Sequence, residues 1–338
     1  MSQLIKSRAP LRISFAGGGT DVSPFLEKYG GAVVNATINK YVSSTLRLRN
    51  DKKISIEVVP EGKIIYPDIR KIQYDGKFDV VKAVIKNLYQ ENKGLDIFVY
   101  KDVGPYSGLG GSAALFVSII GLFNELLERK LDKYEIAELA LRLERDEIKN
   151  LGGRQDQYAT VFGGINFIKF GGKDSVTVSP LNLPQEILGS LEENLILIDL
   201  GARENSGKII EDQIKNIKTK KETLEAMKQT KKIAHRVKRA LLCGNLEELG
   251  KLLDKGWELK KKFSKKISNS KIDKIYNRFK KAGVIGGKIS GAGGGGHMFL
   301  FCKPFERYKV EKEILKSGIK LVPFKLENSG LITWRENF

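Results

Sequence analysis

The sequence is poor in the residues that build disulfide frameworks and zinc sites. Its 338 residues include only two cysteines and two histidines. Cys243 and Cys302 stand far apart, with no second thiol at the spacing of metal ligands. This pattern excludes a disulfide framework and a zinc knuckle. A reducing compartment suits such a chain, and we expect a cytoplasmic protein.

A long apolar run is also missing. The most apolar window, residues 113–127, is interrupted by polar residues such as Asn124 and Glu125, whereas a bilayer span needs roughly 20 apolar residues. We expect a buried helix here and no membrane span. The first 14 residues carry scattered charges without the apolar core of a signal peptide, which disfavours secretion by that route.

Negative charge is scarce and the positive excess is regional. The chain has 59 Lys and Arg against 40 Asp and Glu, a net charge of +19. Residues 208–281 hold 23 of these cations and 9 of the anions, a net +14, which leaves +5 elsewhere. Lysine recurs there in amphipathic helical patterns almost without aromatics, which favours a solvated helix face over a base-stacking platform. Attraction of phosphorylated small molecules is the second interpretation, and nucleic acid is a minor one.

The length and the 41% apolar content favour two domains with sizeable cores. Alternating or β-branched patterns predict strands at residues 8–15, 32–48, 54–59, 95–103, 165–170, 195–200, 320–325 and 330–335. Helical periods predict helices at residues 80–90, 112–128, 133–149, 207–242, 245–263, 271–282 and 305–317. The mixture predicts an α+β fold, with domains at 1–185 and 186–338 because residues 171–189 are turn-rich.

A glycine-rich segment at residues 104–112, here called the second glycine loop, runs directly into a predicted helix that begins near Ser112. Glycines let backbone N–H groups approach a polyphosphate, and the helix presents its positive end to the anion. The Ser112 hydroxyl is suited to the metal that accompanies ATP. A structural turn is the alternative, although four glycines between a strand and a helix favour phosphate binding. The Gly-Lys-Ser/Thr ending of the common P-loop is absent.

Two further glycine loops flank this one in the sequence. The first glycine loop, residues 16–21, ends in Asp21, which either caps the next helix or accepts hydrogen bonds from substrate hydroxyls. The third glycine loop, residues 288–296, lies between two apolar segments. It either completes the wall of a phosphate site or forms a flexible hairpin tip.

Four segments in order carry a resemblance to a known superfamily. They are residues 8–21, 105–114, 153–157 and 288–296. They resemble the motifs of the galactokinase, homoserine kinase, mevalonate kinase and phosphomevalonate kinase (GHMP) superfamily, and the likeness spans essentially the whole chain. The first segment, the Arg-Gln-Asp-Gln run at 154–157 and residues 30–40 most resemble the heptose 7-phosphate kinases.

The resemblance implies a two-domain fold, with an N-terminal domain like ribosomal protein S5 domain 2 and a ferredoxin-like C-terminal domain. ATP and the acceptor would share the cleft between them. The ATP phosphates would contact Gly108, Leu109, Gly110, Gly111 and Ser112 in the second glycine loop, and Gly291, Gly293 and Gly294 in the third. Mg²⁺ would be held by Ser112 and Glu144, although a lone glutamate on a helix is ordinarily solvated. Gly111 departs from the serine of many members.

The same resemblance makes Asp156 the catalytic aspartate, which accepts the proton of the attacking hydroxyl or only orients it. Arg12 would stand beside it as a permanently charged guanidinium, and its local alternative is a strand-end salt bridge. The sugar would contact Gly18, Gly19, Thr20, Asp21 and Arg154. A phosphate on that sugar would need a cationic subsite. The candidates for it by position are Lys40, Arg154, Arg203 and Lys208.

The resulting hypothesis is an ATP- and Mg²⁺-dependent kinase for the anomeric hydroxyl of D-glycero-D-manno-heptose 7-phosphate, giving the 1,7-bisphosphate. One alternative keeps the fold and changes the acceptor to fucose, galactose or a related sugar. Another is a non-catalytic basic protein that binds a ligand or nucleic acid, with strong salt dependence. Neither histidine is expected to act in catalysis: we expect His297 to be packed or hydrogen-bonded, and His235 to lie at the surface.

Overall fold

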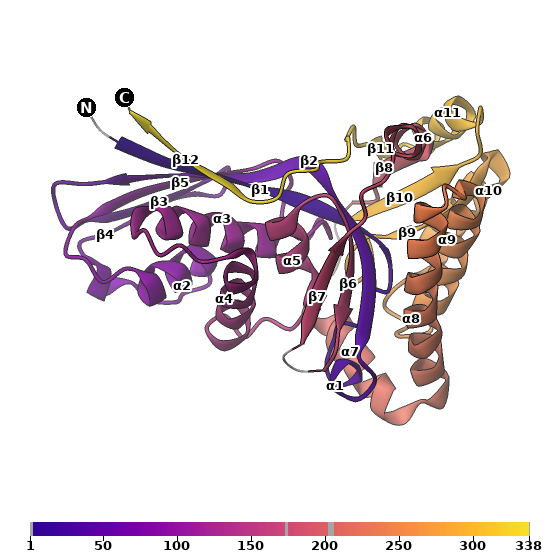
Figure 1. The fold of residues 1–338 in the computed structure, drawn as a ribbon, viewed down its shortest axis with the longest axis horizontal. Helices are drawn as coiled ribbons and strands as arrows, with labels where there is room; N and C mark the ends of the chain where they lie inside the picture. The colour runs from indigo at the N-terminus through magenta and orange to yellow at the C-terminus, as the bar shows by residue number, and fades with distance from the viewer. Residues whose placement is uncertain (1–2, 173–174, 202–205, 338) are drawn as a thin grey trace.

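The computed structural model describes residues 3–172, 175–201 and 206–337. Its strands form two sheets (Figure 1). The larger sheet contains β1 (Gln3–Ala16), β2 (Gly31–Leu48), β3 (Ile54–Val59), β4 (Gly62–Tyr66), β5 (Leu95–Lys101), β6 (Ile165–Phe170), β7 (Val176–Pro180) and β12 (Ile332–Asn337). The smaller, antiparallel sheet has the order β11-β8-β10-β9. Its strands are β8 (Leu195–Asp199), β9 (Val284–Ile289), β10 (His297–Cys302) and β11 (Lys320–Leu321).

Strand β2 joins the two arms of the larger sheet. Its first residues pair with β6 and its last residues with β5, while β1 runs antiparallel beside it. The main order is β12-β1-β2-β5-β3-β4, and among the described strands only β3 and β5 pair in parallel. The β1–β2 register shifts between Pro10 and Leu11 and again between Ser14 and Ala16. Such irregularities bend a strand, and these two flank Arg12.

The helices cover the sheets in two groups (Figure 1). The first half holds α1 (Phe25–Tyr29), the 3-10 turn η1 (Ile69–Lys71), α2 (Asp79–Leu88), α3 (Gly111–Leu126), α4 (Lys133–Asp146) and α5 (Gln155–Phe162). The second half holds α6 (Gln185–Asn194), α7 (Ser206–Thr219), α8 (Lys221–Leu242), α9 (Leu246–Lys261), α10 (Ser270–Ala282) and α11 (Arg307–Lys316). Helix α3 packs on β1 and β2 and is buried along most of its length, which confirms the predicted buried helix. Among the described residues, no helix is both long and apolar enough to cross a membrane.

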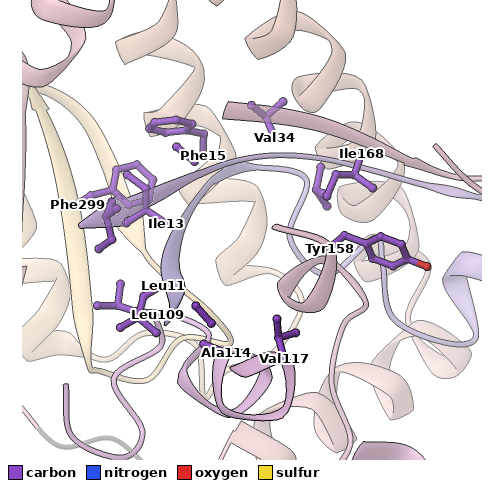
Figure 2. Packing of buried hydrophobic residues seen from close by; sticks show 14 of the residues in the cluster. Leu11, Ile13, Phe15, Val34, Leu109, Ala114, Val117, Tyr158, Ile168 and Phe299 are labelled. Carbon is purple, nitrogen blue, oxygen red and sulfur yellow. The ribbon is translucent and has the colours of Figure 1, made fainter. Parts of the chain in front are cut away.

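The two sheets share a continuous hydrophobic core (Figure 2). Phe15 at the end of β1 meets Phe299 of β10 edge to face, with ring centroids 5.6 Å apart. Both side chains are almost fully buried. An aromatic pair of this geometry contributes about 0.5–1.5 kcal/mol beyond its buried area. This contact holds the end of β1 against the smaller sheet, and the first glycine loop begins directly after it.

Several predicted elements agree with the structure and others differ. Strands 54–59 and 165–170 are confirmed to the residue. The single helix predicted over 207–242 is two helices, α7 and α8, with Lys220 between them in an extended conformation. The stretch 171–189, predicted as turns, contains part of α6 and the short strand β7, which folds back on β6 as a hairpin.

The C-terminal strand crosses back to the first half of the chain. Strand β12 pairs with β1 at the edge of the larger sheet, from Gln3 opposite Asn337 to Arg8 opposite Ile332. An edge strand exposes unpaired N–H and C=O groups, and β12 satisfies them on this side of β1. The end of the chain therefore belongs to the larger sheet, whose other strands all come from residues 3–180. The domain boundary at residue 185 stays a prediction.

Helix α10, one of the basic helices, carries its charge at the surface. In α10, Ile272, Tyr276 and Phe279 are buried, whereas Lys274 and Lys281 are exposed. This is the pattern of an amphipathic surface helix. For α10 the arrangement agrees with a solvated face.

Candidate active site

A cleft with a cavity of about 600 Å³ gathers the predicted site residues. Those that line it are Arg12, Gly18, Gly19, Asp21, Gly108, Gly110, Gly111, Ser112, Glu144, Asp156 and Gly291. A larger cavity of about 1120 Å³, around Leu246 and Phe301, contains none of them. The two cavities differ in the residues that line them. Of the two, the smaller one combines glycine loops, the start of a helix and an ion pair. We therefore take the smaller cavity as the candidate active site.

The centre of the cleft is an ion pair between the buried Arg12 and the half-buried Asp156. Arg12 is 2% exposed, and its Nε and Nη2 donate to Asp156 Oδ1 and Oδ2 at 2.7 and 2.5 Å. Its Nη1 donates to the Gly108 carbonyl at 2.7 Å and reaches the Ser290 hydroxyl at 3.3 Å. A bidentate pair of this kind fixes a carboxylate in position and orientation. One guanidinium therefore ties Asp156, in the first turn of α5, to the second and third glycine loops.

The second glycine loop leaves the start of α3 open to a ligand. Gly108 and Gly110 have φ values of 79° and 82°, a region that side-chain-bearing residues rarely adopt. Gly110 is the N-cap of α3 and provides no side-chain cap. Apart from its own helix and chain neighbours, no described residue has an atom within 4 Å of the position that a Cβ on Gly111 would occupy. The first N–H groups of α3 are therefore available to an anion, as a bound phosphate requires.

Leu109 serves this loop through its backbone. Its carbonyl accepts a hydrogen bond from the Arg12 N–H at 2.9 Å, and its side chain is fully buried in the core. Leu109 does not line the cleft. Its side chain anchors the loop in the core, and its predicted contact with ATP stays a prediction.

Glu144 lies at the cleft beside the start of α3. Its carboxylate accepts hydrogen bonds from the Ser112 hydroxyl at 3.2 Å, Asn150 Nδ2 at 2.7 Å and Gln157 Nε2 at 2.6 Å. The residue is 6% exposed, and burial raises the pKa of its carboxyl above the ordinary glutamate value. A solvated surface glutamate is thus excluded. The nearby guanidinium of Arg145 acts in the opposite direction on that pKa.

The oxygen atoms around Glu144 fit a magnesium ion that arrives with ATP. Mg²⁺ takes hard oxygen ligands and commonly uses one or two protein ligands together with waters and phosphate oxygens. Ser112 and Glu144 supply such oxygens, and Gln157 Oε1 is buried without a hydrogen-bond partner among the described residues. Within the described ranges, no group of three or more His, Cys, Asp or Glu residues forms a self-sufficient metal site. Two protein oxygens of this kind suit an ion that is shared with a bound phosphate.

Asp21 organises the first glycine loop. It is 1% exposed, and its Oδ1 and Oδ2 accept the backbone N–H groups of Gly19 at 3.0 Å and Gln155 at 3.1 Å. The following helix α1 has Pro24 at its N-cap without a side-chain cap, so the helix-capping interpretation of Asp21 is wrong. The carboxylate instead joins the first glycine loop to the start of α5. A Cβ on Gly153 would stand only 2.1 Å from Asp21 Oδ2, which requires glycine there.

Four further predicted residues lie outside the cleft lining. Thr20 is buried and its hydroxyl donates to the Gly17 carbonyl at 2.8 Å, which closes the first glycine loop. Arg154 is half-buried at the N-cap of α5. Gly293 and Gly294 pack against Ile267, to whose carbonyl Gly294 donates at 2.8 Å. Their predicted ligand contacts stay predictions.

The third glycine loop is anchored rather than a free hairpin tip. A Cβ on Gly296 would meet the Ser107 carbonyl at 2.7 Å, and His297 Nδ1 lies 2.8 Å from the same oxygen. The expectation that His297 is packed and hydrogen-bonded is confirmed, and His235 is exposed as expected. The loop thus belongs to the wall of the cleft.

Residues of ordinary helices complete the site, and the sequence pattern did not single them out. Gln213 of α7 is buried and donates to the Gly19 carbonyl at 3.2 Å. Lys260 of α9 is buried, lines the cleft and donates to the Gly291 carbonyl. Of the cations proposed for a phosphate subsite, Lys40 and Lys208 do not line the cleft. Arg203 lies outside the described residues.

Comparison with known proteins identifies the family. The model of the GHMP kinases N terminal domain matches residues 79–164, and that of the GHMP kinases C terminal domain matches residues 225–320. A D-glycero-alpha-D-manno-heptose 7-phosphate kinase from Campylobacter jejuni is 36% identical over 98% of this chain and 99% of that protein. The chain belongs to the GHMP kinase family. It is therefore an ATP-dependent phosphotransferase that acts on alcohol groups.

Solved structures agree with the two-domain GHMP kinase fold. A crystal structure of a D-glycero-D-manno-heptose 1-phosphate kinase from Bacteroides thetaiotaomicron is 32% identical, with a TM-score of 0.83 over 98% of both chains. Lactococcus lactis galactokinase bound to galactose has a TM-score of 0.76 over 97% of this chain and 95% of its own, at 19% identity. The second likeness concerns the fold alone. The expected two-domain α+β GHMP kinase fold is confirmed, and family membership removes the non-catalytic alternative.

Proposed function

We propose that this GHMP kinase transfers the γ-phosphoryl group of ATP to the anomeric hydroxyl of D-glycero-D-manno-heptose 7-phosphate, giving the 1,7-bisphosphate. The observation that carries the catalytic part is the bidentate pair of the buried Arg12 and the half-buried Asp156, which line the cleft together with the start of α3 and the first glycine loop. The choice of acceptor is supported by the 36% identity to the Campylobacter jejuni kinase. The product would supply nucleotide-activated heptose for surface glycans.

Asp156 receives the acceptor hydroxyl in this proposal. Phosphoryl transfer depends mainly on positioning and charge stabilisation. The Asp156 side chain keeps 28% of its surface exposed toward the cleft even though Arg12 holds both of its oxygens. It orients the attacking hydroxyl and takes its proton. Arg12 fixes that carboxylate and places positive charge beside the group in transfer.

The nucleotide occupies the other end of the cleft. Backbone N–H groups of Gly110, Gly111 and Ser112 bind the phosphates, because the start of α3 is uncapped and open. Ser112 and Glu144 hold Mg²⁺, which when bound offsets the negative charge of the phosphates. Beyond the phosphates the cleft is lined by apolar side chains from β2, β3 and α2, and these receive the adenine. Among them are Val42, Val58 and Val80.

The test is phosphoryl transfer from Mg-ATP to heptose 7-phosphate, mannose, fucose, galactose and mevalonate, with phosphorus NMR on the product. Wild-type protein is expected to form an anomeric phosphate on the heptose. Asp156→Asn should lower kcat by about 10²- to 10⁴-fold, the range of general acid–base contributions. Binding of Mg-ATP, measured by calorimetry, should persist in this variant because the start of α3 is intact.

Asp51→Asn is the matched control. Asp51 pairs with Arg49 at the surface, away from the cleft, and exposed pairs contribute little. Turnover of fucose or galactose without turnover of the heptose would replace the proposed acceptor. Full activity of Asp156→Asn would refute the role given to Asp156.

A further inference from the structure

One segment of the chain forms a wall of the cleft at its apolar end. Between the 3-10 turn η1 and the first turn of α2, four residues line the cavity, namely Gly76, Phe78, Asp79 and Val80. The proposed function places the adenine of ATP at this end. The segment that carries these residues, 73–80, is here called the base wall. Its conformation therefore shapes the part of the cleft that receives the base.

The backbone of the base wall adopts a conformation that needs support. Phe78, the N-cap of α2, has a φ of 55°, in the left-handed region that a bulky residue rarely adopts. Gly76 also has a positive φ, 87°, which glycine tolerates. A left-handed phenylalanine is costly and persists only where the surrounding structure enforces it. Other side chains must therefore hold the base wall in this shape.

A fully buried lysine holds it from behind. Lys82, one turn into α2, is 0% exposed. Its Nζ donates to the Gln73 carbonyl at 3.0 Å. It also donates to Asp75 Oδ1 at 2.6 Å and to Asp79 Oδ1 at 3.2 Å. These three hydrogen bonds use all the donors of an ammonium group. Lys82 therefore connects the start of the base wall to its end.

The two carboxylates extend this support to the backbone. Asp79 Oδ1 and Oδ2 accept the N–H groups of Asp75 at 3.2 Å and Gly76 at 2.9 Å. Asp75 Oδ1 accepts the N–H of Lys77 at 2.9 Å. Both carboxylates contact the same Nζ of Lys82, so without this lysine they would repel each other. Removing one partner of a buried ion pair is strongly unfavourable, and here the base wall would open.

We propose that Lys82 is a positioning residue for the nucleotide, which holds the base wall in the shape against which the base of ATP binds. This inference rests on the proposed function, since that places the adenine at the apolar end. Lys82 does not itself line the cleft, so it acts through the base wall. Its side-chain hydrogen bonds run to the base wall and not to the start of α3, where the phosphates bind. The effect of losing Lys82 should therefore depend on the base.

The experiment compares Lys82→Met with wild-type protein in calorimetric binding of two ligands, Mg-ATP and Mg-tripolyphosphate, which has phosphates but no base. If the variant holds the base wall in its competent shape about one tenth of the time, Kd for Mg-ATP rises about tenfold. Kd for Mg-tripolyphosphate should stay nearly unchanged. With saturating Mg-ATP and heptose 7-phosphate as acceptor, kcat should change less than about threefold, because the lost interaction is one of ground-state binding.

A second variant keeps the test decisive if Lys82→Met does not fold. Asp75→Asn removes the charge of the nearest carboxylate of Lys82, and Asp75 is exposed and outside the cleft lining. We expect the same selective weakening of Mg-ATP binding, but smaller, because Gln73 and Asp79 still hold the ammonium group. Lys63→Met is the matched control. Lys63 also forms an ion pair, with Glu57 at 3.4 Å, but is exposed and does not line the cleft.

Thermal unfolding of each variant verifies that it is folded. An equal rise of Kd for both ligands, or an unchanged Kd for Mg-ATP, would overturn the role of Lys82. Wild-type protein that binds Mg-tripolyphosphate as tightly as Mg-ATP would instead overturn the placement of the adenine. Wild-type protein that binds Mg-ATP but phosphorylates no heptose 7-phosphate would overturn the proposed acceptor, while the comparison of the two Kd values would still decide the role of Lys82.

Discussion

Arg12→Lys tests whether the guanidinium fork, rather than positive charge alone, organises the site. Arg12 donates to both oxygens of Asp156 and to the carbonyl of Gly108. A lysine keeps the charge but has a single nitrogen on a flexible stem, so it cannot reproduce the planar fork. The substitution therefore leaves Asp156 free to rotate and removes the link to the second glycine loop.

The expected loss follows from the bonds that disappear. A hydrogen bond to a charged group contributes about 1.5–3 kcal/mol, and the lysine fails to replace about two of them. Because part of the attraction to Asp156 survives, we expect a net loss of about 3 kcal/mol in the transition state. That corresponds to a fall in kcat of about 100-fold. The free energy of unfolding should drop by about 1–3 kcal/mol because the Arg12 side chain is buried.

The assay measures kcat and KM from ADP release with Mg-ATP and the acceptor, and the free energy of unfolding from urea titration. Arg12→Lys combined with Asp156→Asn should be little worse than Asp156→Asn alone, because Arg12 acts mainly through that carboxylate. A kcat within about threefold of the wild-type value would refute the reasoning. Additive losses in the double variant would show that Arg12 works independently of Asp156.

Two further perturbations test the magnesium site and the first glycine loop. Glu144→Gln should weaken Mg-ATP binding in calorimetry, yet raise the unfolding temperature of the ligand-free protein at neutral pH. Burial raises the pKa of Glu144 in the folded protein. Ionisation of Glu144 therefore destabilises the folded state, and this destabilisation grows as the pH rises from the ordinary glutamate pKa to the raised pKa. The gain should vanish on acidification below the ordinary value, and a gain independent of pH would contradict this cause. Gly153→Ala should raise the acceptor KM at least about tenfold and lower the free energy of unfolding by about 1–3 kcal/mol, since its Cβ would displace the Asp21 carboxylate. Gly189→Ala is the control: Gly189 is in α6, and apart from that helix no described residue has an atom within 4 Å of its Cβ position. This variant should increase the free energy of unfolding by about 0.5–1 kcal/mol. Equal acceptor KM values for the two variants would exclude the steric argument.

Local patterns anticipated most of the elements and the chemistry of the loops. The alternation at residues 54–59 and the apolar helix after the second glycine loop follow from side-chain periodicity, which acts over a few residues. Gly108 and Gly110 were expected in a phosphate-binding loop, and both adopt positive φ. The roles of Arg12, Glu144 and Asp156 came from the resemblance of ordered motifs rather than from periodicity. The strand β7 and helix α6 escaped prediction because short elements carry weak periodic signals.

The sequence by itself therefore determined the family, the glycine loops and the residue types of the site, because these depend on short motifs. Only the tertiary structure decided which charges meet. Arg12 and Asp156 are 144 positions apart, and they pair because the last part of β1 and the start of α5 lie at the same cleft. Likewise, nothing local distinguishes Lys260 from the neighbouring lysines of α9. Its position facing Gly18 and Gly291 arises from the packing of that helix against β9, which no spacing in the chain encodes.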